Sequence, residues 1–244
     1  CIPAEPTKVI GESAAMHAIF QTIRKFSDTD ANLLLLGENG TGKDVIARLL
    51  YRYSPRYGKP FVTIDLGSIP EQLFESELFG FEKGAFTDAK KSKAGRMEVA
   101  TNGTLFLDEI GNLSLPMQSK LLTAIEKRQI SRLGSTQTMP IDVRLICATN
   151  ADIRHMVDEG SFRQDLLYRI NTIEIHIPPL RERGNDIILL AEYFLDLYSS
   201  KYKTEKLKLD NMVRENLVNR EYEGNVRELE GLIEESTVLG SFEN

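Results

Sequence analysis

The feature that most constrains this fold is an apolar strand that runs directly into a glycine-rich loop ending in lysine. Residues 33–36 are all leucine, and residues 37–43 read Gly-Glu-Asn-Gly-Thr-Gly-Lys, which fits the pattern Gly-x4-Gly-Lys. Backbone N–H groups in such a loop point at phosphate oxygens, and its glycines let the backbone approach them closely. A flexible turn without a ligand is the alternative. The strand before the loop and the helical pattern after it favour a phosphate-binding loop, with a helix dipole that attracts the anion.

The last loop residue and the next one have separate predicted roles. Lys43 is expected to reach the β- and γ-phosphates of a nucleotide. The common loop continues with a Ser or Thr hydroxyl that binds magnesium, whereas this chain has Asp44. A carboxylate there either holds the metal through water or begins the helix favourably, and the sequence leaves both roles open.

Strand and helix patterns alternate around this loop. Apolar runs bounded by turn residues occur at 33–36, 61–66, 104–107, 144–148 and 173–177. Helical periodicity occurs at 14–26, 44–53, 72–78, 117–127 and 153–158. Such alternation requires crossover connections, so we predict an α/β fold with a five-stranded parallel sheet sandwiched by helices. Residues 129–142 interrupt this order and are interpreted as a loop or a hairpin insertion.

The strand signal stops after Pro178-Pro179, and helical patterns follow at 186–202, 210–219 and 225–239. The prolines and the stretch Arg-Glu-Arg-Gly at 181–184 mark a plausible boundary. We therefore expect an α/β nucleotide-binding subdomain at 1–178 and a small all-α subdomain at 179–244.

A hydrophobic strand at 103–107 ends in two carboxylates, Asp108 and Glu109. Ligands of open α/β sheets gather at the carboxyl ends of strands. Asp108 is expected to hold the hydration shell of magnesium, and Glu109 to orient and polarise an attacking water. The alternative is a pair of exposed acids at a turn, and the phosphate loop upstream favours the catalytic interpretation.

Two further groups have suitable chemistry. Thr149 and Asn150 follow the strand at 144–148 and are candidates to contact the water or the γ-phosphate. Arg163 and Arg169 flank a short amphipathic segment. Phosphoryl transfer gains from an arginine that meets the developing charge, often from another subunit. Taken alone, either arginine also fits an ordinary surface charge.

Composition narrows the function classes. The 244 residues include 30 basic and 36 acidic side chains, a net charge of −6, which argues against a surface built mainly to grip DNA phosphates. No apolar run approaches the roughly 20 residues that span a bilayer, and no signal pattern is present, so we expect a cytoplasmic protein. Two cysteines are too few for a disulfide framework, and Cys147 is expected to be buried in a strand. His17, His155 and His176 lack metal-ligand spacing.

From about Val9 to Val238, these residues closely resemble the central AAA+ domain of NtrC-type bacterial enhancer-binding proteins, the sigma-54-dependent activators. The most specific element is 77–89, where family members carry Gly-Ala-Phe-Thr-Gly-Ala on a loop that contacts sigma-54. Other AAA+ branches lack this insertion. The resemblance implies a P-loop ATPase with a helical lid that remodels the closed promoter complex of RNA polymerase holoenzyme carrying sigma-54. The positions matched to sigma-54 contact are Gly84, Ala85, Phe86, Thr87, Asp88 and Ala89.

The resemblance also implies roles around ATP and Mg²⁺. The positions matched to nucleotide binding are Ile10, Gly11, Gly37, Glu38, Asn39, Gly40, Thr41, Gly42, Lys43, Asp44 and Arg227. Ile10 and Gly11 match residues that line the adenine pocket, and Arg227 matches the second sensor on the lid. Asp108 and Glu109 match the metal-site and catalytic carboxylates.

Other matched positions imply assembly into a ring. Thr149 and Asn150 match the first sensor, and Arg163 and Arg169 match a pair of arginines that act on a neighbouring subunit. Such proteins form ring homo-oligomers, commonly hexamers. Members often carry a sensory domain, as in two-component systems, and a helix-turn-helix domain. The chain opens on Cys1 rather than Met, so we expect a piece of a longer protein that binds DNA mainly through a domain outside this chain, with no membrane association.

Three positions depart from the commonest family pattern. Asp44 stands where Glu is usual, and Asp88 replaces the second glycine of the sigma-54 loop. Asp65 stands where many members have an Asn that positions the catalytic glutamate. An ionised Asp65 cannot donate a hydrogen bond to Glu109 and would repel it, so we expect the switch to run through a shared proton, a water or another residue.

Two other functions compete with the sigma-54 assignment. An ATPase with a different target, such as a chaperone or unfoldase, would not need the insertion around Phe86, which would then be an ordinary buried aromatic. A nucleotide-gated binding module without catalysis would explain Asp65 and Asp88 as signs of decay. The retained Lys43 and Glu109 argue against that module.

Overall fold

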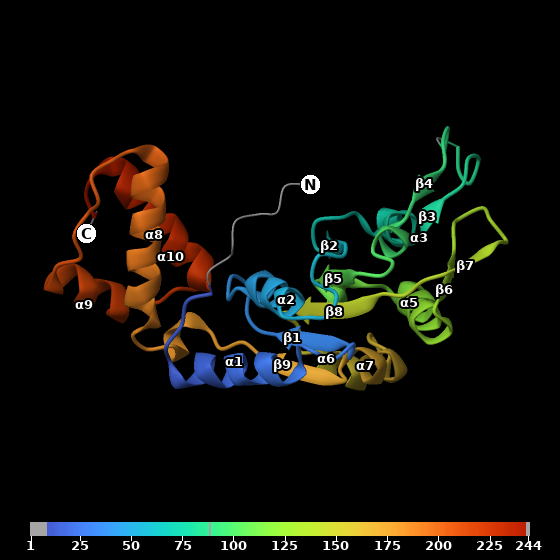
Figure 1. The fold of residues 1–244 in the computed structure, drawn as a ribbon, viewed down its shortest axis with the longest axis horizontal. Coiled ribbons are helices and arrows are strands. Elements are labelled where there is room, and N and C mark those ends of the chain that lie inside the picture. Colours follow the sequence, from blue (N-terminus) through green and yellow to red (C-terminus); the bar gives the residue numbers. More distant parts are fainter. Residues whose placement is uncertain (1–8, 88, 243–244) are drawn as a thin grey trace. The chain divides into compact units, whose positions relative to one another are not determined.

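The computed structural model describes residues 9–87 and 89–242 and contains a five-stranded sheet in the order β2-β5-β8-β1-β9 (Figure 1). The strands are β1 (Leu33–Leu36), β2 (Phe61–Asp65), β5 (Thr104–Asp108), β8 (Arg144–Thr149) and β9 (Ile173–His176). Strand β1 pairs with β8, β5 with β8 and β2 with β5, and all three pairings are parallel. The predicted α/β fold with five strands is confirmed.

Helices connect these strands, as the periodicity predicted. They are α1 (Ala14–Phe26), α2 (Lys43–Arg52), α3 (Phe74–Phe79), α5 (Leu115–Lys127) and α6 (Ile153–Asp158). Two further helices, α4 (Arg96–Val99) and α7 (Gln164–Ile170), had no predicted counterpart. α4 is a single turn of four residues, and α7 lies in the amphipathic segment between Arg163 and Arg169 that the sequence showed without assigning it to a helix.

The chain divides into two compact units. The sheet unit comprises residues 24–36 and 47–175, and the lid unit comprises the described residues of 1–23, 37–46 and 176–244. The predicted subdomain boundary at residue 179 stays a prediction. The phosphate loop belongs to the lid unit together with the C-terminal helices.

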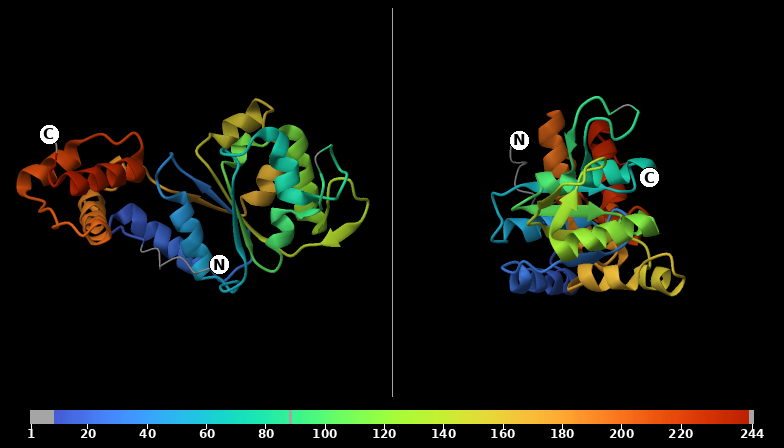
Figure 2. Two further views of the ribbon diagram at one scale, coloured as in Figure 1. Left: turned by 90° about the horizontal axis from the view of Figure 1, so that it is seen from above. Right: turned by 90° about the vertical axis from the view of Figure 1, so that its right-hand side faces the viewer.

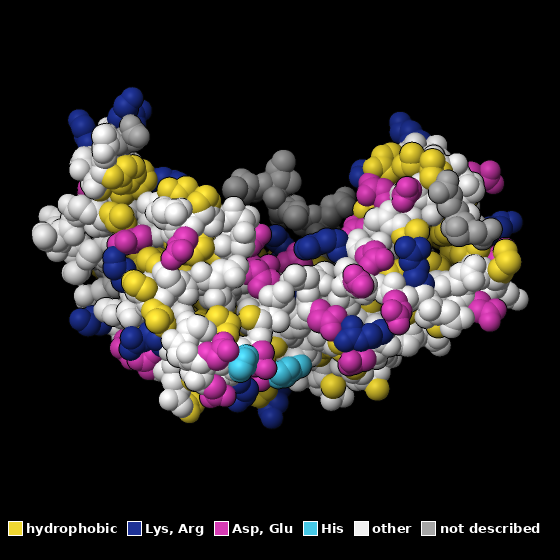
Figure 3. Space-filling view, turned by 180° about the vertical axis from the view of Figure 1, so that it is seen from behind, with side chains coloured by type: hydrophobic (Ala, Val, Ile, Leu, Met, Phe, Trp, Pro, Cys, Tyr) yellow, Lys and Arg dark blue, Asp and Glu magenta, His cyan; other side chains and the backbone are white. Residues whose placement is uncertain are grey.

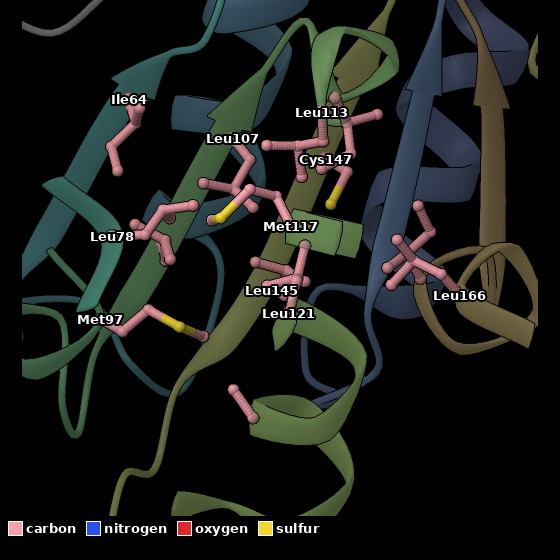
Figure 4. Packing of buried hydrophobic residues seen from close by; sticks show 14 of the residues in the cluster. Ile64, Leu78, Met97, Leu107, Leu113, Met117, Leu121, Leu145, Cys147 and Leu166 are labelled. Carbon is pink, nitrogen blue, oxygen red and sulfur yellow. The ribbon is translucent and has the colours of Figure 1, made fainter. Parts of the chain in front are cut away.

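The core of the sheet unit forms where helices cover the central strands. Every residue of β8 is buried, which requires cover on both faces of the sheet. Leu107 and Cys147 from neighbouring strands pack with Leu121 of α5 (Figure 4). Cys147 is a buried strand cysteine as predicted, and its burial raises the pKa of the thiol.

The lid unit has its own apolar core, built from three helices that match the predicted ranges to within one residue. These helices are α8 (Asp186–Tyr202), α9 (Asn211–Asn219) and α10 (Asn225–Leu239). Fully buried Leu195, Leu229 and Ile233 lie at its centre. Leu229 and Ile233 lie one turn apart on α10, and Leu217 of α9 belongs to the same cluster, so the apolar faces of all three helices contribute to this core.

Two short hairpins project side by side from the sheet unit (Figures 1 and 2). The first pairs β3 (Gly80–Phe81) with β4 (Lys93–Ala94), and the second pairs β6 (Gln129–Ser131) with β7 (Thr138–Pro140). An isolated bridge joins Phe81 to Leu133. Of the two predictions for 129–142, a loop or a hairpin, the hairpin is therefore correct.

The surface mixes charges of both signs. On the face in Figure 3, acidic and basic side chains lie interspersed among apolar ones. Within residues 9–87 and 89–242, no helix combines the length and apolar character that crossing a bilayer requires.

Replacing a central core side chain tests this packing. Leu107 is fully buried, so Leu107→Ala leaves a cavity and should lower the free energy of unfolding by about 2–5 kcal/mol. Val99→Ala, at a half-exposed position of the same unit, is the matched control and should change it by roughly 0.5 kcal/mol or less. Urea unfolding measures both, and equal effects would contradict the assignment of the core.

Candidate functional site

The phosphate loop leaves β1 at Gly37 and ends where α2 begins. Gly40 and Gly42 have φ values of +75° and +94°, which glycine adopts readily and other L-residues rarely adopt. Lys43 is buried, and its Nζ donates to the carbonyl oxygens of Gly37 at 3.0 Å and Glu38 at 3.2 Å. The ammonium group is thus held against the loop itself. This geometry fits the predicted cradle for phosphate.

The N-terminus of α10 lies directly against this loop. The backbone N–H groups of Val226 and Arg227 donate to Gly40 O at 3.0 and 3.4 Å. A Cβ on Gly40 would lie 2.1 Å from Gly224 O, a distance at which the backbone would have to shift. Gly40 is therefore required both by its φ and by the close approach of the lid.

The segment predicted to line the adenine pocket is anchored on α8. Ile10 packs against the apolar core of the lid unit, and a Cβ on Gly11 would lie 3.2 Å from an oxygen of Asp186. The buried Asp186 carboxylate accepts from Glu12 N at 2.7 Å, Ser13 N at 2.9 Å and Ser13 Oγ at 2.6 Å. These bonds fix Ile10 and Gly11 beside the lid helices.

The acidic pair ends β5 in the sheet unit. Glu109 has φ 55° and ψ 49°, the left-handed region that is uncommon for a residue with a side chain. Its N–H donates to Asp108 Oδ1 at 3.1 Å, and its Oε2 accepts from Asn150 N at 3.4 Å. The predicted catalytic carboxylate is therefore a strained residue next to the predicted first sensor, as strained residues at functional sites often are.

Thr149 completes this group from the end of β8. It is buried, and its Oγ1 accepts from Ala151 N at 3.1 Å. A Cβ on Gly111 would lie 3.2 Å from that oxygen, so the glycine leaves space for the hydroxyl. The structure thus brings the two predicted sensor residues and Glu109 to one edge of the sheet.

Asp65 pairs with Asp108 in the β2–β5 register, at the same edge. Its Oδ1 accepts from Gly67 N at 2.8 Å, so this carboxylate closes a turn of its own strand end. The Cβ position built on Gly67 lies 3.2 Å from Asp65 Oδ1, 3.6 Å from Glu109 Cγ and 3.5 Å from Asn112 Nδ2. Asn112, which the sequence did not single out, therefore borders the same space beside Gly67 as Asp65 and the Glu109 side chain.

The two predicted trans-acting arginines are both exposed: Arg163 is the N-cap residue of α7 and Arg169 lies in the last turn of that helix. The guanidinium of Arg163 binds Asp165 through two bonds of 3.0 and 2.6 Å, and Ser119 Oγ at 3.1 Å. The hydrogen bond to Asp165 raises the pKa of Arg163, and the same bond lowers the pKa of Asp165. The carbonyl oxygen of Arg169 accepts from Asn32 Nδ2 at 3.0 Å, which ties the end of α7 to the sheet.

The loop predicted to contact sigma-54 extends from the β3–β4 hairpin. Phe86 is 45% exposed, and its ring centroid lies 4.8 Å from that of Phe81, so the alternative of an ordinary buried aromatic is wrong. Gly84 N donates to Ala89 O, and Ala89 N to Phe86 O, both at 2.9 Å. Thr87 is exposed, whereas Asp88 lies outside the described residues.

An ion-pair network joins the base of this loop to the second hairpin. Arg132 binds Glu82 at 2.9 Å and Glu98 at 2.6 Å. Glu82 N also donates to Leu133 O at 2.9 Å, and Ala85 packs near Gly134. The exposed Phe86 is thus presented on a base that both hairpins support.

The predicted site residues fall into one set in each unit. The lid unit contains the nucleotide set, from Ile10 through the phosphate loop and Asp44 to Arg227. Asp44 is exposed in the first turn of α2, where a negative charge favours the helix dipole. The sheet unit contains Asp65, the acidic pair, the sensors, the two arginines and the sigma-54 loop.

The sequence missed several side chains of the lid unit that hold the phosphate loop. Arg181 and Asn225 both bind Glu38. The buried Arg183 donates to Thr41 O at 2.7 Å and to Pro178 O at 2.9 Å. The stretch 181–184 predicts only a boundary, because these arginines lie more than 140 positions from the phosphate loop along the chain.

Comparison with known proteins matches two different families to the N-terminal and C-terminal parts of the chain. Residues 9–176 match the family model "Sigma-54 interaction domain", and residues 181–243 match "AAA+ ATPase lid domain". The chain is 45% identical over 237 residues to the transcriptional regulatory protein ZraR of Klebsiella oxytoca, covering 97% of this chain and 54% of that protein. It is 44% identical to the regulatory protein AtoC of Escherichia coli, covering 96% of this chain and 50% of that protein. The chain thus spans about half the length of these relatives.

Solved structures agree with the fold. NtrX from Brucella abortus in complex with ADP superimposes with a TM-score of 0.90 at 30% identity, covering 98% of this chain and 52% of that one. NtrX in complex with ATP gives the same TM-score of 0.90. Hsp104 bound to ATPγS and casein shares the fold alone, with a TM-score of 0.68 at 17% identity.

The approach of the lid to Gly40 is testable. Gly40→Ala forces both a positive φ and a clash with Gly224 O, whereas Gly58→Ala has a φ of +84° with no atom within 4 Å. The control should lose about 1–2 kcal/mol of stability from its backbone strain alone, and Gly40→Ala clearly more. Thermal unfolding of both variants measures the difference. Equal losses would show that the backbone of Gly224 does not constrain the loop.

Proposed function

This chain belongs to the sigma-54 interaction domain family, and on that premise we propose that it hydrolyses ATP to remodel the closed promoter complex of RNA polymerase carrying sigma-54. The observation that carries this proposal is the combination, within one family-matched chain, of a phosphate loop and an exposed Phe86 on a supported hairpin. The phosphate loop would bind the ATP whose hydrolysis supplies energy, and Phe86 gives the hairpin an apolar surface that can contact a partner.

Nucleotide binding rests on the lid unit. The loop amides and Lys43 are proposed to hold the phosphates, Ile10 and Gly11 to contact the adenine, and Arg227 to contact the phosphates from the lid. Burial of Lys43 against its own loop supports this, because the ammonium is already in place to meet an anion.

A magnesium ion fits the donors present. Asp108 ends a strand at the ligand-binding edge of the sheet, and its carboxylate oxygen is a hard ligand suited to Mg²⁺ through water, with exposed Asp44 as a second candidate. When bound, the ion neutralises negative charge on the phosphates.

For hydrolysis, Glu109 is proposed to accept a proton from the attacking water and so strengthen its nucleophilicity. The bond from Asn150 N to Glu109 Oε2 holds the carboxylate toward the first sensor. Thr149 and Asn150 are therefore proposed to report the presence of the γ-phosphate to Glu109. Asp65 already accepts from Gly67 N, and Asn112 borders the same space, so Asn112 is proposed as a candidate amide donor for a switch at Glu109.

Ring assembly completes the site. Arg163 and Arg169 are exposed on α7, and we propose that they neutralise charge developing on the γ-phosphate held by a neighbouring copy, as a hexamer would allow. Within the subunit, the Arg163 guanidinium forms an ion pair with Asp165. When Arg163 binds a neighbouring copy's γ-phosphate, the phosphate replaces the Asp165 carboxylate as its partner.

The wider context follows from the family. The protein to which this chain corresponds is proposed to act in the cytoplasm as a transcriptional activator, with sensory and DNA-binding functions in segments beyond those matched here. A chaperone-like target is disfavoured by the insertion at 77–89. A module without catalysis is disfavoured by the strained Glu109 beside its sensor.

The sigma-54 contact has a direct test. With an ATP transition-state mimic bound, the wild-type protein should retain sigma-54 in a pull-down, and Phe86→Ala should lose it while keeping ATP hydrolysis. The ring is half exposed, so its removal subtracts apolar contact with little effect on folding.

Tyr57→Ala is the matched control, since Tyr57 is also an exposed aromatic that contacts a second ring, that of Tyr51. The control should bind sigma-54 as the wild type does. Retained binding by Phe86→Ala would overturn the contact, and absence of sigma-54 from the wild-type pull-down would overturn the proposed target.

A further inference from the structure

Asn225 is a buried amide at the junction of lid and phosphate loop. Its side chain is 0% exposed, and its φ of +53° lies in the left-handed region, which Asn tolerates better than most residues. Its Oδ1 accepts from Leu180 N at 2.8 Å. Its Nδ2 donates to Asn39 O at 3.0 Å and to Glu38 Oε2 at 3.1 Å. One side chain therefore joins the start of the lid to two loop residues.

Glu38 is the charged partner in this junction. Arg181 binds it through two bonds, Nη1 to Oε2 at 2.9 Å and Nη2 to Oε1 at 2.6 Å. The Arg181 guanidinium, and after it the Asn225 amide, lower the pKa of Glu38 to about 2, so the carboxylate stays ionised at neutral pH. The second residue of the phosphate loop thus bears a full negative charge.

That charge opposes nucleotide binding unless it is compensated. Phosphate oxygens and a carboxylate repel each other, and water screens part of this repulsion because the Glu38 side chain is 44% exposed. The donors from Arg181 and Asn225 offset the charge and turn the carboxylate toward the lid. They also fix the Glu38–Asn39 backbone, whose conformation decides where the loop amides point.

We propose that Asn225 is a positioning residue for nucleotide binding, which holds the phosphate loop in its anion-binding shape by donating to Glu38 and to the Asn39 carbonyl. The lid and the loop then act as one element, so an arrangement of the lid that breaks these bonds also weakens the nucleotide site. This inference rests on the proposed nucleotide binding and adds a residue that acts through the loop without touching the ligand.

The purely structural alternative is that Asn225 matters only as an acceptor for Leu180 N and as a residue that tolerates positive φ. Asn225→Asp separates the two roles. Asp keeps the shape, the acceptor and the tolerance of left-handed backbone, and removes the donor. In its place a second carboxylate meets Glu38.

Asn225→Asp should therefore weaken ADP binding by about tenfold or more, since a charge-assisted hydrogen bond becomes a repulsive contact. Adding Glu38→Gln should restore much of that affinity, because the Gln amide can donate to Asp at position 225. Asn216→Asp, at an exposed position of α9, is the matched control and should bind ADP as the wild type does. Calorimetric titration with ADP measures all four proteins, and thermal unfolding without nucleotide measures their stability.

The outcomes are distinct. Weak ADP binding by Asn225→Asp with rescue by Glu38→Gln supports the proposal. Wild-type ADP affinity in Asn225→Asp overturns the proposal. A loss of affinity that Glu38→Gln does not reverse also overturns it. So does a loss of affinity that is explained by a lower unfolding temperature. Failure of the wild-type protein to bind ADP would instead overturn the proposed function.

Discussion

A phosphate loop binds an anion only if its amides are held pointing inward before the anion arrives, and much of this structure serves that requirement. The buried β1 fixes where the loop begins, and α2 fixes where it ends. Between them, Gly40 and Gly42 adopt positive φ, and Lys43 is held against loop carbonyls. Because the amides are already ordered, binding need not supply that conformational entropy.

Two of the five described non-glycine residues with positive φ lie where chemistry is proposed. Glu109 and Asn225 are both non-glycine residues with positive φ, one at the candidate catalytic carboxylate and the other at the lid–loop junction. Each is held by hydrogen bonds that would be lost if the local backbone relaxed. Such positions persist only when their surroundings determine them, which makes the nucleotide set and the carboxylate set sensitive to local packing.

The sequence predicted the parts of the fold and site that follow local patterns. The five strands, the lid helices, the loop of Lys43 and the carboxylates of Asp108 and Glu109 were all visible as periodicity or as short motifs. The contacts of Asn225 with Glu38 and of Arg183 with Thr41 join residues 187 and 142 positions apart, and no local pattern encodes such a pair. The exposure of Phe86 likewise depends on the hairpin beneath it, which only the three-dimensional arrangement reveals.

The proposed ATP hydrolysis requires both the phosphate loop around Lys43 and the Glu109 carboxylate. Phosphate release and ATP binding should be measured side by side for the wild type, Lys43→Ala and Glu109→Gln. Lys43→Ala should lose both ATP binding and phosphate release. Glu109→Gln should still bind ATP while its turnover falls by about 10²-fold or more. Undiminished turnover in either variant would contradict this requirement.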